Sequence, residues 1–304
     1  MVNEQYITDD LFQRERDTEA ADIYIKHSLL RDIKKEFWNN KPALICVFLL
    51  AIVVVAALLA PLSPYEPNAI NAMQRLKPMS AEHWFGTDEF GRDYFTRILY
   101  GGRVSLAVGF ASMIVTVIIG TAIGILSGYI GGKLDMMLMR FTDIFLALPS
   151  TLLMVVLNTL LQPGLITLVC VLSLFSWASV ARITRAETIA LKERDFVVAS
   201  KNLGTGNLKI ALVHIVPNIL GPITVAASLG VANAILTESS LSFLGLGVQV
   251  PQASWGSMLQ TAQGNMMNNP LLAIFPGACI LITVLSFNLI GDVLRSALEP
   301  KIVK

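Results

Sequence analysis

The stretch ALICVFLLAIVVVAALLA, residues 43–60, contains no charged side chain. A helix of this length extends about 27 Å, close to the ~30 Å hydrocarbon core of a bilayer. The stretch therefore predicts a membrane-spanning helix. The hydrophilic residues before it, 1–42, lack the short apolar core and small-residue cleavage site of a signal peptide, so we expect this first helix to be permanent.

The composition of the whole chain agrees with a membrane protein. Of its 304 residues 54% are hydrophobic and only 15% charged, and the mean hydropathy is +0.62, which few soluble domains reach. We expect an all-α integral membrane protein with six transmembrane helices. The five further apolar runs are 104–130, 136–161, 164–181, 219–246 and 271–291.

The distribution of positive charge predicts the orientation. If the N-terminus lies inside, 18 of the 23 Lys and Arg residues fall in inside segments. The other five lie in the long outer loop 61–103, and long loops follow the charge rule poorly. Both termini are therefore predicted to face the cytoplasm.

The sequence also predicts two local structures, a glycine face on the second span and a helix in the outer loop. Gly120, Gly124 and Gly128 lie on one face of the second span and allow close helix packing, either within the chain or against another subunit. The outer stretch HWFGTDEFGRDYFTRILYGGR, 83–103, predicts an interfacial amphipathic helix that begins at Thr87. Its expected ion pairs on the wet side are Asp88 with Arg92 and Asp93 with Arg97.

Three acidic residues lie in or beside the predicted spans. Asp143 has Arg140 one turn away and Asp292 has Arg295, so both are interpreted as paired structural groups. Glu238 has no such neighbour, and of the three it is the candidate for translocation or gating.

The longest basic interior loop, 182–218, ends in NLGTGNLKIALVHIVPN, 202–218. Gly204 is placed to stop one helix, a second helix is predicted to begin at Thr205, and Pro217 is predicted to end it. Its apolar residues recur at the spacing of one helical face, which predicts a compact cytoplasmic helix that docks into a partner groove or lies on the inner membrane surface. These residues are Leu208, Ala211, Leu212 and Ile215.

The spacing of Ala199, Gly204 and Pro217 resembles the cytoplasmic EAA signature of ABC-importer permeases, although Val198-Ala199-Ser200 replaces the Glu-Ala-Ala triplet. Other stretches resemble, in order, segments of the C-type permease of dipeptide, oligopeptide and nickel importers. They are HWFGTDEFGRDYFTRILYGGRVSL, HIVPN, ESSLSFLGLGVQVPQASWGSML and FNLIGDVLRSALEP. The resemblance covers the chain from about residue 40 to its end.

The resemblance implies the type I ABC importer permease fold and a set of partners. A homologous second permease completes the pathway, two ABC ATPase subunits bind the cytoplasmic loops and an extracytoplasmic binding protein delivers the cargo, expected to be peptides. ATP and Mg would bind to the ATPases, so no cofactor, metal or catalytic site is expected in this chain. Its membrane environment is lipid, and no nucleic-acid partner is expected. The implied ATPase-coupling residues are Ala199, Ser200, Gly204, Leu208, Ala211, Leu212, Ile215 and Pro217.

The residues themselves leave other functions open. The closest approach to a phosphate loop, GYIGGKL at 128–134, lacks the first glycine and the Ser or Thr after the lysine, so ATP is expected to bind elsewhere. A nickel importer permease, an ion-coupled secondary transporter using Glu238 and a membrane enzyme using buried acids remain as alternatives. The expected organisation is a cytoplasmic segment 1–42, a first span 43–60, an outer loop 61–103 and a core permease domain 104–304.

Overall fold

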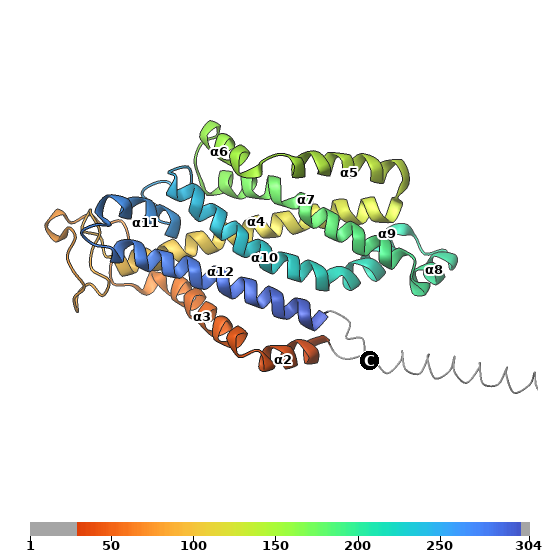
Figure 1. Ribbon diagram of the computed structural model, residues 1–304, viewed down its shortest axis with the longest axis horizontal. Coiled ribbons are helices and arrows are strands. Elements are labelled where there is room, and N and C mark those ends of the chain that lie inside the picture. Colours follow the sequence, from red (N-terminus) through yellow and green to blue (C-terminus); the bar gives the residue numbers. More distant parts are fainter. Residues whose placement is uncertain (1–28, 299–304) are drawn as a thin grey trace, which may run out of the picture.

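The computed structural model describes residues 29–298, and every named element in this part of the chain is a helix (Figure 1). Residues 1–28 of the predicted N-terminal segment and residues 299–304 lie outside the described residues. The α-helices are α2 Leu29–Asn39, α3 Lys41–Leu58, α4 Tyr94–Ile130, α5 Gly132–Ala147, α6 Ser150–Leu160, α7 Leu165–Lys192, α8 Asp195–Asn202, α9 Asn207–Ile210, α10 Val216–Phe243, α11 Trp255–Ala262 and α12 Leu271–Leu298. Shorter turns are η1 Ala60–Leu62, η2 Ala72–Gln74, η3 Ala211–Ile215 and η4 Gln263–Asn265.

Five helical segments are long and apolar enough to cross a bilayer. They are α3, α4, α7, α12 and the segment Asn207–Phe243, which includes α10. Each overlaps one of the predicted runs, and the four longest exceed the hydrocarbon thickness. In Figure 1 these helices run roughly along the long axis of the molecule, with α8 and α9 at one end and α11 with the loops after α3 at the other.

The third predicted span, 136–161, is not a single straight helix. It is divided into α5 and α6, which are bent by 82° to one another, so that the pair counts as a sixth, broken span. The break falls at Leu148 and Pro149, both of which have extended or non-helical backbone angles. Proline disfavours helical geometry in the residue before it, and this signal was present in the sequence.

The three glycines of α4 pack within the chain, which confirms the intrachain alternative. A Cβ atom added to Gly120, Gly124 or Gly128 would lie 2.5–2.9 Å from a side-chain Cβ atom of α7. Backbone carbonyl oxygens of α7 lie equally close to each of these positions. Only glycine allows this approach of two helix backbones, which we call the glycine seam.

The outer region differs from the interfacial helix predicted over 83–103. Helix α4 begins at Tyr94, and Asp93 caps it by accepting a hydrogen bond from the Thr96 backbone N–H (2.8 Å). The residues before Asp93 form a tight turn in which Gly86 and Gly91 have positive φ. A helix beginning at Thr87 does not form because the positive φ of Gly91 would interrupt it, and Asp93 is the better-placed cap.

The predicted ion pairs of this region are partly confirmed. Arg92 Nε lies 2.7 Å from Asp88 Oδ2, but the pair is buried rather than on a wet face. Asp93 does not pair with Arg97: its Oδ2 lies 2.8 Å from His83 Nδ1, while Arg97 Nε lies 3.5 Å from Asp88 Oδ2. The outer residues therefore form a packed cap on the bundle.

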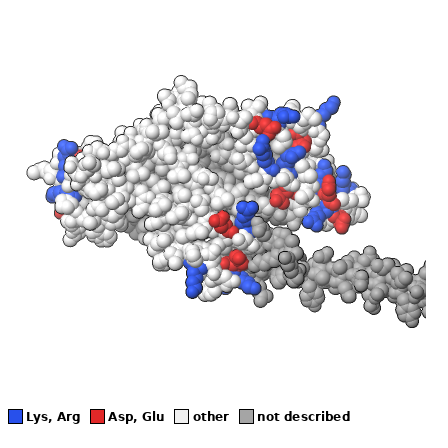
Figure 2. All heavy atoms as spheres, in the orientation of Figure 1, with Lys and Arg blue, Asp and Glu red and all other residues white. Residues whose placement is uncertain are grey.

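In Figure 2 charged side chains gather at the end that carries the outer loops, at the opposite end around α8 and α9, and in a lower group around α2, and the surface between these groups carries few charges. This is the distribution expected of a protein whose middle lies in hydrocarbon. The end that carries α8 and α9 also holds the ion pair of Asp143 with Arg182 (2.5 Å) and the longer contact of Asp143 with Arg140 (4.0 Å). The pairing predicted for Asp143 is thus confirmed, with Arg182 as its nearer partner. The pairing of Asp292 with Arg295 and the cytoplasmic placement of the termini stay predictions.

Candidate functional site

The loop 182–218 folds into a helical hairpin formed by α8, α9 and η3, which we call the coupling hairpin. Helix α7 continues to Lys192, and α8 follows after a break at Glu193 and Arg194. The chain then reverses at Gly204, whose φ of +79° confirms the predicted left-handed stop. The Thr205 backbone N–H donates to the Ser200 carbonyl (3.1 Å), which closes the end of α8 in the manner of a Schellman motif.

The second arm of the hairpin is not a separate short helix. Helix α9 begins at Asn207 rather than Thr205, passes through a π-helical turn at Ala211–Ile215, and continues directly into α10. Pro217 does not end the helix: the helix continues through it, directly after the π-helical turn, where the regular hydrogen-bond pattern is already interrupted. The Asn218 side-chain amide donates to the His214 carbonyl (2.6 Å) beside this proline.

The predicted apolar stripe is divided between two faces. Leu208 and Leu212 are 74% and 58% exposed, but Ile215 is fully buried. The π-helical turn adds a residue to the helical repeat, which changes the direction of the side chains after it. The buried ridge consists instead of Ile210, Ile215 and Ile219.

The buried ridge attaches the hairpin to the membrane helices. Ile210, Ile215 and Ile219 pack with Val197 of α8 in one apolar cluster. Partly buried side chains of α4 and α7 pack against the same cluster; they are Val117, Ile125, Tyr129 and Leu191. A displacement of the hairpin would therefore be passed to three membrane helices by direct packing.

The two arms of the hairpin are also joined by polar and aromatic contacts. Ser200 Oγ lies 3.2 Å from His214 Nε2, and the His214 and Phe196 rings are 6.1 Å apart between centroids. Nothing in the sequence pattern predicted this contact of His214. Ala199 is exposed near the end of α8, and its carbonyl accepts from the Leu203 backbone N–H.

The outer face of the hairpin is apolar and exposed. Its large side chains are Phe196, Leu203, Leu208, Leu212 and Val213. Apolar side chains gathered on a compact surface outside the hydrocarbon region are typical of a protein docking site. Exposure of Leu208 and Leu212 agrees with the predicted role, although only half of the predicted stripe faces outward.

A second candidate region is a cavity of about 470 Å³ between α4, α5, α6, α7 and α10. No charged residue lines it. Its polar groups are hydroxyls and one amide, carried by Thr116, Ser150, Ser176, Ser179, Asn233 and Thr237. The break between α5 and α6 opens onto this cavity, since Leu148 and Ser150 are among its lining residues. Sequence reasoning did not identify these residues, because they come from five separate helices.

Glu238 lies next to this region but does not line the cavity. Its side chain is fully buried and accepts hydrogen bonds from the hydroxyls of Ser105 (3.0 Å) and Ser242 (2.7 Å). Ser105 Oγ in turn accepts from the Trp255 backbone N–H (3.2 Å), so the network joins α4, α10 and α11. The role of Glu238 in translocation or gating stays a prediction.

The broken span, the polar membrane cavity and the hairpin continuous with a span together define a multi-pass membrane transport protein. Residues 120–304 match the family described as the binding-protein-dependent transport system inner membrane component. The chain belongs to this family. Residues 28–78 also match the N-terminal transmembrane domain of oligopeptide transport permease C.

Curated relatives agree over most of the chain. The dipeptide transport system permease protein of Alkalihalophilus pseudofirmus is 42% identical over 92% of each chain. The oligopeptide transport system permease protein of Bacillus subtilis is 39% identical over 91% of each chain. The oligopeptide permease protein of Haemophilus influenzae is 42% identical over 90% of this chain and 89% of its own. The protein is therefore a multi-pass permease of the bacterial inner membrane, as the sequence resemblance indicated.

Proposed function

We propose that this chain is the transmembrane permease subunit of an ATP-driven ABC importer and forms half of the pathway for di- or oligopeptides. Support comes from the names of its relatives, which are peptide permeases and favour peptides over nickel. Membership of a binding-protein-dependent family also disfavours the ion-coupled transporter and the membrane enzyme. ATP and Mg bind to the partner ATPases, and this chain has no catalysis of its own.

The partners follow from the same assignment. A homologous second permease faces the cavity between α4, α5, α6, α7 and α10 and completes the pathway. Two ABC ATPase subunits bind the coupling hairpins, and an extracytoplasmic binding protein delivers the peptide at the opposite end. The uncharged lining of the cavity suits a peptide, because hydroxyl and amide groups hydrogen-bond to peptide groups without selecting a side-chain charge.

The coupling role rests on one observation, the two-sided construction of the hairpin. Leu208 and Leu212 are exposed, while Ile210 and Ile215 are buried against the spans. Closure of the ATPase dimer around ATP would move the exposed face, and the buried ridge would move α4, α7 and α10 with it. ATP can change the direction in which the pathway opens only if it favours one ATPase arrangement and the hairpin transmits that preference.

The test introduces charge on the exposed face of the hairpin. Leu208→Glu with Leu212→Glu should lower ATPase co-purification and peptide-stimulated ATP hydrolysis at least tenfold, because burial of a leucine at an interface contributes about 1.5–3 kcal/mol. The matched control is Ile70→Glu with Met73→Glu, two exposed apolar residues in the loop after α3, at the other end. The control should leave ATPase co-purification unchanged. Unchanged co-purification in the Leu208 and Leu212 variant would refute the coupling role.

The cargo is tested separately from the coupling. The purified complex, reconstituted with its binding protein in liposomes, should hydrolyse ATP faster with peptides of two to several residues than without them. Ni²⁺ alone should have no such effect. Stimulation by Ni²⁺ and not by peptides would assign the chain to nickel import and leave the coupling role intact.

A further inference from the structure

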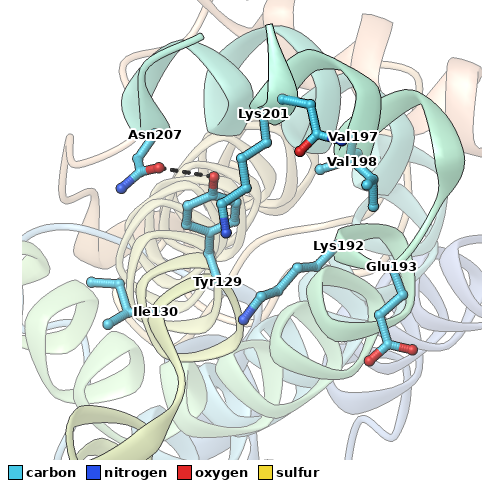
Figure 3. Close-up of a pocket in the computed structure, with 9 residues that line it drawn as sticks. Tyr129, Ile130, Lys192, Glu193, Val197, Val198, Lys201 and Asn207 are labelled. Carbon is cyan, nitrogen blue, oxygen red and sulfur yellow. Dashed lines mark hydrogen bonds between the residues drawn. The ribbon is translucent and has the colours of Figure 1, made fainter. Parts of the chain in front are cut away.

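A cavity of about 640 Å³ lies beside the coupling hairpin, between the ends of α4 and α7 and the helices α8 and α9. Figure 3 shows its lining residues. Tyr129 and Ile130 come from the last turn of α4, Lys192 from the end of α7, and Lys201 from α8. The cavity thus lies at the level where two membrane spans end.

The cavity carries concentrated positive charge. In Figure 3 the ammonium groups of Lys192 and Lys201 point into the space beside the Tyr129 ring, and the carboxylate of Glu193 points away from it. Lys192 Nζ lies 6.0 Å from the centroid of that ring. Among residues 29–298, no carboxylate lies within ion-pair distance of either ammonium group.

Neighbouring cations at this end of the molecule are neutralised. Arg185 forms a two-pronged pair with Asp135 (2.6 and 2.7 Å), and Arg182 pairs with Asp143 (2.5 Å). The two lysines of the cavity form no such close pair, although Asp135 lies near enough to interact electrostatically with Lys192. Two ammonium groups that face the same space favour an anion there.

The cavity also has an ordered wall and apolar sides. The Tyr129 hydroxyl donates to Asn207 Oδ1 (3.1 Å), which ties the end of α4 to α9. Ile130 and Val198 are substantially exposed and line the same space. A ligand that fills it would therefore combine an anionic group with adjoining apolar carbon.

We propose that this cavity binds the headgroup of an anionic phospholipid, with the phosphate between Lys192 and Lys201 and the first acyl carbons against Ile130 and Val198. Basic pockets between the ends of membrane helices bind such headgroups, and a phospholipid joins a phosphate to apolar carbon in one molecule. The bound lipid would bridge the end of α4 to the coupling hairpin, independently of which cargo is carried.

The experiment uses the complete transporter purified in neutral detergent and titrated with lipid under native mass spectrometry. Dioleoylphosphatidylglycerol should bind more tightly than dioleoylphosphatidylcholine, which has the same acyl chains but no net charge. Each lysine near the membrane surface contributes about a fivefold gain, so Lys192→Ala with Lys201→Ala should weaken phosphatidylglycerol binding ~30-fold. Lys192→Arg with Lys201→Arg should retain binding because the charge is kept.

The matched control removes two other exposed lysines at the same end. Lys133→Ala with Lys209→Ala causes the same change in net charge outside the cavity, and should leave phosphatidylglycerol binding within about twofold. Equal binding of the two lipids, or equal loss in the control, would overturn the proposal.

Two further results would assign the cavity to another occupant and also overturn it. Displacement of phosphatidylglycerol by millimolar inorganic phosphate would indicate a site for free phosphate. Loss of the ATPase from the Lys192 and Lys201 variant, with lipid binding unchanged, would indicate that an acidic side chain of the ATPase fills the cavity.

Discussion

The glycine seam between α4 and α7 gives the sharpest prediction for stability. A Cβ atom on Gly124 would lie 2.5 Å from Thr184 Cβ and 2.6 Å from the Ala181 carbonyl oxygen. Both atoms belong to α7, and neither is the far end of a flexible side chain. Gly124→Ala can therefore be accommodated only if the two helices separate.

The size of the effect follows from these distances. The Thr184 contact is about 0.9 Å short of an ordinary carbon contact, so the helices must move apart by most of that distance. Overpacking of this kind costs about 1–3 kcal/mol. For a domain of comparable size each kcal/mol lowers the melting midpoint by roughly 2–4 °C. Gly124→Ala should thus lower the midpoint of the purified protein by several degrees.

A glycine in another membrane helix supplies the control. Gly277 of α12 has one atom, Leu259 Cδ2, at 4.0 Å from the position of an added Cβ, so an alanine fits there. Gly277→Ala should be neutral or slightly stabilising, since alanine favours the helix by up to about 1 kcal/mol. Thermal unfolding in the same detergent, followed by circular dichroism, compares the two variants. If the two variants have the same melting midpoint, the close approach of α4 and α7 is wrong.

Two further predictions concern the outer cap. Asp93→Ala removes the cap of α4 and the partner of His83, so it should lower the free energy of unfolding by about 2–3 kcal/mol, and Asp93→Asn should lower it less. Neither variant should affect ATPase co-purification. Loss of the ATPase from Asp93→Ala would instead place this region on the ATPase side of the membrane and contradict the proposed topology. Burial, followed by the charge of Asp88, raises the pKa of the Glu89 carboxyl above its ordinary value of 4.5. The stability that protonated Glu89 contributes is therefore present below about pH 4.5 and lost as the pH rises through the raised pKa. As the pH rises from 4.5 to 7, the melting temperature of Glu89→Gln should therefore rise relative to that of the native protein. A difference between the two melting temperatures that stays constant with pH would contradict this.

Several predictions from the sequence are confirmed because they depend on local chemistry. The apolar runs located the five long membrane helices and the region of the bent pair α5 and α6, since a span is defined by its own length and hydropathy. Gly204 was identified as a helix stop because a positive φ favours glycine. The pair of Asp88 with Arg92 forms as predicted, but in a non-helical turn and not on the helical face from which it was predicted.

Two predictions about helix ends were wrong, because the effect of a proline depends on its structural surroundings. Pro217 was expected to end a helix, but the helix continues through it, directly after the π-helical turn Ala211–Ile215. Pro149 was not expected to break a span, although the same residue type bends α5 and α6 apart by 82°. Residue type alone did not distinguish these two prolines, since their effects depend on what precedes them in the folded helix.

The sequence by itself determined the class of protein, the positions of its spans and the stop at Gly204, because a bilayer and a left-handed turn each impose a requirement on a short stretch of chain. Only the tertiary structure decided which residues meet. Lys192 and Lys201 share a cavity with Tyr129, and the hydroxyls that line the membrane cavity come from separate helices, because side-chain contacts across distant segments depend on packing angles that no local pattern encodes.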